Sequence, residues 1–206
     1  MNVAKVVLQY KGEKVGIAPF NRNIANSSNY RFWFQDNAVT KYNSHGKFNM
    51  TENQIESFLD SLGSKDQVVF AIFCLPDKES QDEKARNLIH VGNVSLQKID
   101  FVNGSAEYAI IIGEPDFYRK GLATEATKMI LYHGFYKLGL SRIYAGTPAT
   151  NTGMIKVFEK IGFTHEGTER RAMFLNGTVA NVERYSMLYA DEAAHQLIKE
   201  GREKHE

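Results

Sequence analysis

One stretch of the sequence, residues 108–133, constrains the fold more than any other. It opens with an apolar segment, residues 108–113, which predicts a buried strand. It closes with residues spaced as on one face of a helix, the apolar Leu122, Ala126, Met129 and Ile130 and then His133. The residues between the two segments are few. The strand therefore leads through a short turn near Gly121 directly into a helix.

This turn gives the helix an N-terminus that suits an anion. The first backbone N–H groups of a helix have no partner within it and lie at the positive end of the helix dipole, so a phosphate fits there. Gly121 lets a ligand approach the backbone because no Cβ intervenes. Arg119 and Lys120 add positive charge. By itself, however, a glycine at such a turn is equally compatible with an ordinary tight turn.

Composition and length predict a single domain over residues 1–206, with a polar C-terminal tail from about residue 199. The hydrophobic fraction of 43% is ordinary for a globular protein, and the net charge of +1 predicts no nucleic-acid or membrane partner. No apolar run approaches the roughly 20 residues of a membrane helix, and no signal peptide is visible. The single Cys74 cannot form an internal disulfide, which favours a reducing compartment, the cytoplasm.

The order of the expected elements predicts an α+β domain with a mixed, largely antiparallel sheet flanked by helices. Helices are expected at residues 24–35 and after a capping box made by Thr51 and Gln54, with a polar connection between them. A third helix follows Gly121 to about residue 138, a fourth follows residue 151, and a last one begins near residue 190. Strands are expected at residues 3–9, 15–19, 67–75, 88–98, 105–113, 142–147, 163–169 and 182–188.

Three motifs in this order resemble those of one enzyme family. The turn fits the pattern (Gln/Arg)-x-x-Gly-x-(Gly/Ala), with Gly121 and Ala123 in place and Tyr118 where Gln or Arg is usual. Residues 91–96 resemble a third-strand signature, and residues 151–163 resemble the segment Asn-x-x-(Ala/Ser)-Ile-x-x-x-Glu-Lys-x-Gly-Phe. The combination resembles the GNAT N-acetyltransferase superfamily, and within it the RimJ/RimL-like (ribosomal-protein-alanine acetyltransferase-like) branch.

The resemblance implies the GNAT acyl-CoA N-acyltransferase fold and acetyl-CoA as acetyl donor, with no metal. The donor would lie between two strands that splay apart, residues 105–113 and 142–147. Its pantetheine arm would pair with the backbone of Ile111, Ile112 and Gly113. Its diphosphate would lie on the N–H groups of Arg119, Lys120, Gly121, Leu122, Ala123 and Thr124. Asn151 and Phe158 would contact the arm from the next helix, although Asn151 is explained equally well as a helix N-cap.

The proton-transfer residues of the family do not carry over to this chain. Many members have a tyrosine seven residues after the asparagine, and that position is Phe158 here. Some have a glutamate five residues before the asparagine, and that position is Gly146. Glu107, beside the expected gap, is the candidate general base, directly or through water. A simple ion pair with a nearby cation explains Glu107 as well, and positioning with a water relay is the alternative mechanism.

The acceptor is expected to be a primary amine: a protein N-terminus, or a small amine such as an amino sugar or a polyamine. It would enter opposite the donor, past the first two helices, where the candidate contacts are Tyr30, Tyr42, His45 and Phe48. The loss of the usual tyrosine leaves an alternative, a catalytically weak acyl-CoA-binding sensor or partner-binding module. Because relatives are often dimers, the resemblance also predicts a possible homodimer.

Overall fold

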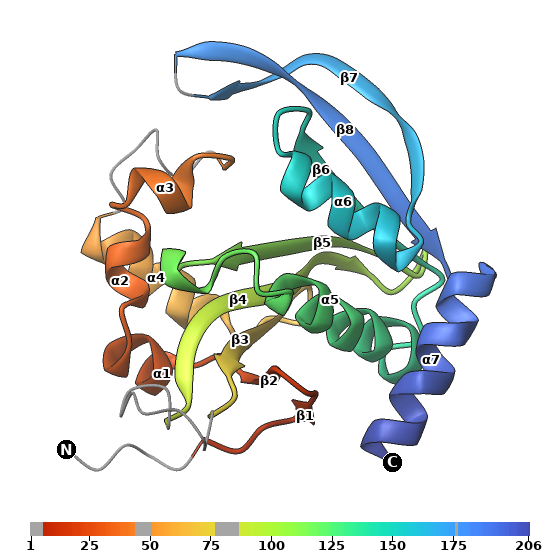
Figure 1. Ribbon diagram of the computed structural model, residues 1–206, viewed down its shortest axis with the longest axis horizontal. Helices are drawn as coiled ribbons and strands as arrows, with labels where there is room; N and C mark the ends of the chain where they lie inside the picture. Colours follow the sequence, from red (N-terminus) through yellow and green to blue (C-terminus); the bar gives the residue numbers. More distant parts are fainter. Residues whose placement is uncertain (1–5, 44–50, 77–86, 176) are drawn as a thin grey trace.

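The computed structural model describes residues 6–43, 51–76, 87–175 and 177–206, and their strands form one eight-stranded sheet (Figure 1). The strand order is β1-β2-β3-β4-β5-β6-β8-β7, and every neighbouring pair is antiparallel except β5 and β6. The α+β prediction is therefore confirmed. The strands are β1 (Tyr10–Lys11), β2 (Val15–Pro19), β3 (Val68–Cys74), β4 (Ile89–Asp100), β5 (Ser105–Ile112), β6 (Arg142–Pro148), β7 (Thr164–Leu175) and β8 (Thr178–Leu188).

The two parallel strands form a fork. β5 and β6 pair only over their first three residues, ending at the pair Glu107 and Tyr144. Beyond this pair the two strands diverge, so the second half of β5 is bonded to β4 alone (Figure 1). The splayed strands that the sequence predicted are confirmed, and the backbone edge of β5 faces the open side of the fork.

The helices cover the two faces of the sheet and enclose two separate cores. One core lies under α5 (Leu122–Tyr132), its π-helical extension (His133–Lys137), α6 (Thr152–Ile161) and α7 (Glu192–His205). The other lies under α1 (Arg22–Ser27), α2 (Tyr30–Trp33), α3 (Asn37–Thr40) and α4 (Glu52–Ser61). The fork is thus bordered by α5 and α6 on one face and by the N-terminal helices on the other.

Several predicted boundaries are corrected. The single helix expected at residues 24–35 is two short helices, because Ser28 is extended (φ −129°, ψ 178°) and its polar neighbours favour turns over a helix interior. The expected polar connection contains α3, which Asp36 caps. Residues 6–9 of the opening strand expected at 3–9 are not a strand, and the first strand among the described residues is Tyr10–Lys11. The polar segment expected from residue 199 continues α7 as a helix to His205.

The last two strands are longer than predicted and form a hairpin that extends past the rest of the sheet (Figure 1). β8 pairs with β6 only from Val182 onward, whereas its first residues pair with β7 alone. β7 and β8 can continue beyond the end of β6 because they hydrogen-bond to each other and need no third strand.

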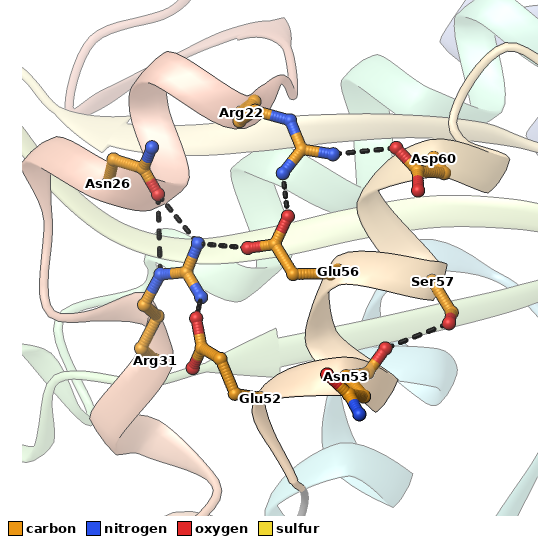
Figure 2. Close-up of polar contacts among 8 residues, drawn as sticks. All are labelled: Arg22, Asn26, Arg31, Glu52, Asn53, Glu56, Ser57 and Asp60. Carbon is orange, nitrogen blue, oxygen red and sulfur yellow. Dashed lines mark hydrogen bonds and ion pairs between the residues drawn. The ribbon is translucent and has the colours of Figure 1, made fainter.

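Ion pairs fasten the N-terminal helices to one another. Figure 2 shows Arg22 of α1 and Arg31 of α2 pointing at the same carboxylate, Glu56 of α4. Arg22 also contacts Asp60, and Arg31 also contacts Glu52. The predicted capping box at the start of α4 is confirmed. An exposed ion pair is worth little alone, but here two arginines and three carboxylates form a network across three short helices.

Candidate active site

The N-terminus of α5 carries donors that no side chain caps. Gly121 is the N-cap residue at φ +82°, and among the described residues no side chain caps the helix there. The first bond within the helix runs from the Glu125 N–H to the Gly121 carbonyl, at 3.3 Å. The N–H groups that precede it, from Leu122 to Thr124, therefore have no partner within the helix.

The backbone just before α5 is strained in a way that suits an anion. Arg119 (φ +62°) and Gly121 (φ +82°) are both left-handed, and only glycine adopts this conformation freely. Left-handed residues next to other conformations turn successive N–H groups toward one point, as in known anion-binding loops. Strain of this kind is typical of functional sites. From these φ values we expect the N–H groups of residues 119–124 to converge on a bound anion.

A third cation lies beside this turn. The ammonium of Lys14, from the turn between β1 and β2, donates a hydrogen bond to the Lys120 carbonyl oxygen at 3.2 Å. Sequence reasoning missed Lys14 because 106 residues separate it from Lys120. The contact depends on the β1–β2 turn packing against α5, which no local pattern reports.

The open edge of β5 is offset by one residue from the prediction. The Gly113 N–H donates to the Val91 carbonyl oxygen at 2.8 Å, and the Ile111 carbonyl points toward Gly92 of β4. Since residues of an antiparallel pair alternate, Ile112 and Ile110 turn their N–H and C=O groups toward the fork. The predicted backbone pairing of a cofactor arm through Ile111 and Gly113 is therefore wrong, whereas the choice of Ile112 agrees with the geometry.

Tyr118 closes part of this edge. Its hydroxyl donates to the Ile112 carbonyl oxygen at 3.1 Å, so the turn is tied back onto β5. The residue that stands where the family pattern has Gln or Arg thus holds the turn in place. The Ile112 N–H remains directed to the open side of the fork.

Trp33 of α2 fixes the end of β5 from the opposite face. A Cβ on Gly113 would lie 1.9 Å from Cδ2 of Trp33, so only glycine lets the indole cross the strand here. The indole Nε1–H and the Asn29 side-chain amide both donate to Oε1 of Glu114, at 2.9 and 3.0 Å. The N-terminal helices are therefore anchored to the segment that leads into the α5 turn.

Asn151 and Phe158 both have structural roles in α6. The Asn151 side chain accepts from the Met154 N–H at 3.2 Å and donates to Thr147 Oγ1 at 3.2 Å, which confirms the N-cap interpretation. Phe158 is 1% exposed and packs against Tyr108, Phe163 and Tyr185. Its ring offers no proton donor, and the contact of either residue with a cofactor stays a prediction.

Glu107 lies where the fork closes, opposite Tyr144, and is paired. Its Oε2 is 2.7 Å from Nζ of Lys98, a side chain that is 73% exposed, while Glu107 itself is 23% exposed. The hydrogen bond and the charge of Glu107 raise the pKa of Lys98. The ion pair that the sequence allowed is thus present, and it leaves the carboxylate reachable from the solvent side.

An arginine, Arg184, fills the space beside Gly146. A Cβ on Gly146 would lie 2.5 Å from Nη1 of Arg184. The other side of this guanidinium binds Glu169, with Nε 2.8 Å from Oε1. The missing side chain at residue 146 is thus what allows the guanidinium of Arg184 to lie against β6.

Of the four residues predicted to contact an acceptor, the structure describes two, Tyr30 and Tyr42. Tyr30 is 2% exposed and packs among Phe20, Trp33 and Phe34, so it has no surface to offer and that prediction is wrong. Tyr42 is half-buried, with Lys41 Nζ 5.0 Å from its ring centre. The other two predicted contacts, His45 and Phe48, lie outside the described residues.

A buried histidine lies between the N-terminal helices and the sheet. His90 on β4 contacts Ser28 Oγ through Nδ1 and Asn93 Oδ1 through Nε2, both at 2.9 Å. Because the Asn93 oxygen can only accept, Nε2 carries the proton and Nδ1 accepts from Ser28. Burial lowers the pKa of His90 to about 4, so the ring is neutral near pH 7. It joins the α1–α2 junction to the sheet.

The described residues lack two further features, a metal-binding cluster and a membrane-spanning helix. No group of three or more His, Cys, Asp and Glu side chains there could hold a metal ion. Among the same residues, no helix has both the length and the apolar character needed to cross a membrane.

Residues 17–164 match the family model for the acetyltransferase (GNAT) domain, and that match covers more than half of the chain. The chain belongs to the GNAT acetyltransferase family. This GNAT protein is 34% identical over 132 residues to the spermidine N(1)-acetyltransferase of Escherichia coli (strain K12), which covers 61% of this chain and 68% of that protein. It is 25% identical over 189 residues to the probable N-acetyltransferase YjcK of Bacillus subtilis (strain 168), covering 88% and 98% of the two chains.

The fold is shared with a solved structure, spermidine N-acetyltransferase from Vibrio cholerae in complex with CoA and spermine. The two superpose with a TM-score of 0.71 at 22% identity, over 86% of this chain and 96% of that one. At this identity the likeness shows the fold alone. The matches confirm the superfamily, and they do not single out the RimJ/RimL-like branch.

As a GNAT enzyme, the protein is an acetyl-CoA-dependent N-acetyltransferase. Its residues fit the donor on three counts that the structure shows: an uncapped helix N-terminus, a left-handed turn with three cations beside it, and an open β5 edge. When bound, acetyl-CoA supplies the thioester carbon that an amine attacks. The diphosphate would lie on the N–H groups of residues 119–124, and the arm along Ile112 and Ile110.

Proposed function

We propose that this GNAT enzyme acetylates a primary amine by direct attack in a ternary complex, with Glu107 as the general base. The observation that carries the proposal is the position of Glu107 at the closed end of the fork, on a carboxylate that remains 23% exposed. A base there lies at the meeting point of the two strands that would hold the donor. No covalent intermediate on the enzyme is required.

Lys98 supports the assignment because its side chain is itself a primary ammonium. Its Nζ, 2.7 Å from the carboxylate, marks where the ammonium of an acceptor would bind. An exposed ion pair of this kind is worth only about 0.2–1 kcal/mol, so an acceptor can displace it. Glu107 would then take the proton that the amine must lose before it attacks.

The remaining steps fall to the backbone and to solvent. Backbone N–H groups on the open β5 edge would stabilise the charge that develops on the carbonyl oxygen. Phe158 cannot donate a proton to the leaving thiolate. The thiolate takes that proton from water, because a thiol with an ordinary pKa of about 8.5 is mostly protonated near neutral pH.

Two acceptor classes follow from different observations. The names of the spermidine acetyltransferase relatives favour a polyamine, and we place that class first. A protein N-terminus follows from the RimJ/RimL-like motifs. The charges near the base do not favour a polycation strongly, because each carboxylate is paired: Glu107 with Lys98, Glu166 with Arg142, and Glu169 with Arg184.

The test is release of free thiol from acetyl-CoA with a panel of amines: spermidine, spermine, an amino sugar and peptides with a free N-terminus. We expect turnover with at least one amine, and loss of most of it in Glu107→Gln, with a rise in KM of no more than about fivefold because the exposed ion pair that binds the acceptor is weak. Full activity of Glu107→Gln with every accepted amine would reject Glu107 as the base. Tight CoA binding without turnover across the panel would favour the alternative, a sensor or partner-binding module.

A further inference from the structure

The turn between β1 and β2 is fastened to α5 by one carboxylate. Glu125 accepts three backbone N–H groups, those of Glu13, Lys14 and Val15, at 2.7, 2.9 and 2.9 Å. Gly12 makes the approach possible, since a Cβ there would lie 2.3 Å from Oε1 of Glu125. A carboxylate with three N–H donors holds a turn in one place, because each bond to a charged group is stronger than a neutral one.

With the β1–β2 turn held by Glu125, the Lys14 side chain reaches the turn that precedes α5. Its Nζ bonds the Lys120 carbonyl and lies 3.7 Å from the position that a Cβ on Gly121 would take. The ammonium therefore lies beside the left-handed turn that precedes α5. Its present partner is a neutral carbonyl at 3.2 Å, which is a weaker acceptor than a phosphate oxygen.

We propose that Lys14 binds a phosphate group of the acetyl donor, and that Glu125 is the positioning residue that holds Lys14 at that place. The inference rests on the proposed donor site at residues 119–124 and adds to it a binding residue from a distant part of the chain. Coenzyme A carries a diphosphate and a separate 3′-phosphate. Both have the same chemistry toward an ammonium, and both lie at the end of the molecule that the α5 turn would hold.

The experiment is titration calorimetry of CoA and of 3′-dephospho-CoA into the full chain and into Lys14→Gln. We expect Lys14→Gln to bind CoA about tenfold more weakly, since a partly exposed bond to a charged group is worth on the order of 1–2 kcal/mol. If the loss vanishes with 3′-dephospho-CoA, Lys14 reads the 3′-phosphate. If it persists, Lys14 reads the diphosphate. Affinity within twofold of the full chain for both ligands overturns the proposal.

Three further variants complete the design. Lys65→Gln removes a lysine from the exposed connection between α4 and β3 and should leave CoA affinity unchanged. Lys14→Arg should restore most of the affinity. Glu125→Gln should weaken CoA binding although Lys14 is intact, and thermal unfolding checks that each variant is folded.

The same titrations separate this inference from the donor site on which it rests. Gly121→Ala changes the turn itself and should weaken CoA whether or not Lys14 takes part. If Gly121→Ala weakens binding and Lys14→Gln does not, only the role of Lys14 fails. If neither change matters, the α5 turn is not the donor site.

Discussion

A graded series at Gly121 gives the sharpest test of how the α5 turn works. Gly121 has φ +82°, and a Cβ there would find only Lys14 Nζ within 4 Å in the described part of the chain, at 3.7 Å. No protein atom would clash, so a substitution acts through the backbone conformation. The left-handed region costs an ordinary L-residue about 1–2 kcal/mol, Asn tolerates it better, and a β-branched residue tolerates it worst.

The expected order of CoA affinity is therefore Gly, then Asn, then Ala, then Val. The penalty of about 1–2 kcal/mol corresponds to a fivefold to thirtyfold loss for Gly121→Ala if the turn relaxes to escape the strain. If the turn does not relax, the same free energy appears as a lower stability toward urea. Measuring both the Kd by calorimetry and the free energy of unfolding accounts for the whole penalty.

The comparison of Asn with Ala decides the reasoning, because both add the same Cβ. An Asn variant that binds CoA more tightly than the Ala variant shows that the left-handed backbone is what matters. Equal affinity for Gly, Asn, Ala and Val, with unchanged stability, would refute the argument that this turn needs its conformation.

The remaining predictions concern Glu107, Lys98 and His90. Glu107→Gln should lower kcat about 10²–10⁴-fold, the usual contribution of a general base, in a steady-state thiol-release assay. Lys98→Ala should lower the KM for a cationic acceptor by up to about fivefold, with kcat unchanged, because an exposed pair is worth at most about 1 kcal/mol; a higher KM would contradict the displacement model. His90 has a pKa lowered to about 4, so between about pH 6.5 and pH 4 the unfolded chain binds a proton that the folded chain does not. The contribution of His90 to stability should therefore fall by ~3 kcal/mol as the pH drops through that window. Burial lowers the pKa of His133 to about 4 as well, so the total fall is larger, and urea unfolding of His90→Gln should show a fall smaller by the His90 share.

The parts of the site that the sequence predicted are local ones. Gly121 follows a strand and opens a helix within a few residues, so spacing and turn chemistry predicted the turn itself, and the family resemblance assigned the donor to it. Asn151 as an N-cap was readable for the same reason, since the capping side chain and the helix are adjacent. The fork between β5 and β6 followed from the family resemblance.

The parts that were missed depend on contacts between distant segments. Lys14 meets Lys120 only because Glu125 holds the β1–β2 turn against α5. Tyr30 was predicted to contact an acceptor from its position in the sequence, but the aromatic side chains around it bury it. The one-residue error on β5 is a matter of phase: an apolar run shows that a strand exists, and only the bond from Gly113 to β4 shows which residues face the fork.

The expected homodimer and the cytoplasmic location stay predictions, as do the contacts of His45 and Phe48. None of them enters the argument for the donor site. That argument depends on the backbone of residues 119–124 and on the cations beside it.

Hydrogen exchange of backbone amides with and without CoA tests this claim most directly. The account predicts that CoA slows the exchange of the amides at residues 119–124 and of Ile112, while the β7–β8 hairpin tip is unchanged. Slower exchange confined to other segments, with residues 119–124 exchanging as fast as in the free protein, would contradict it.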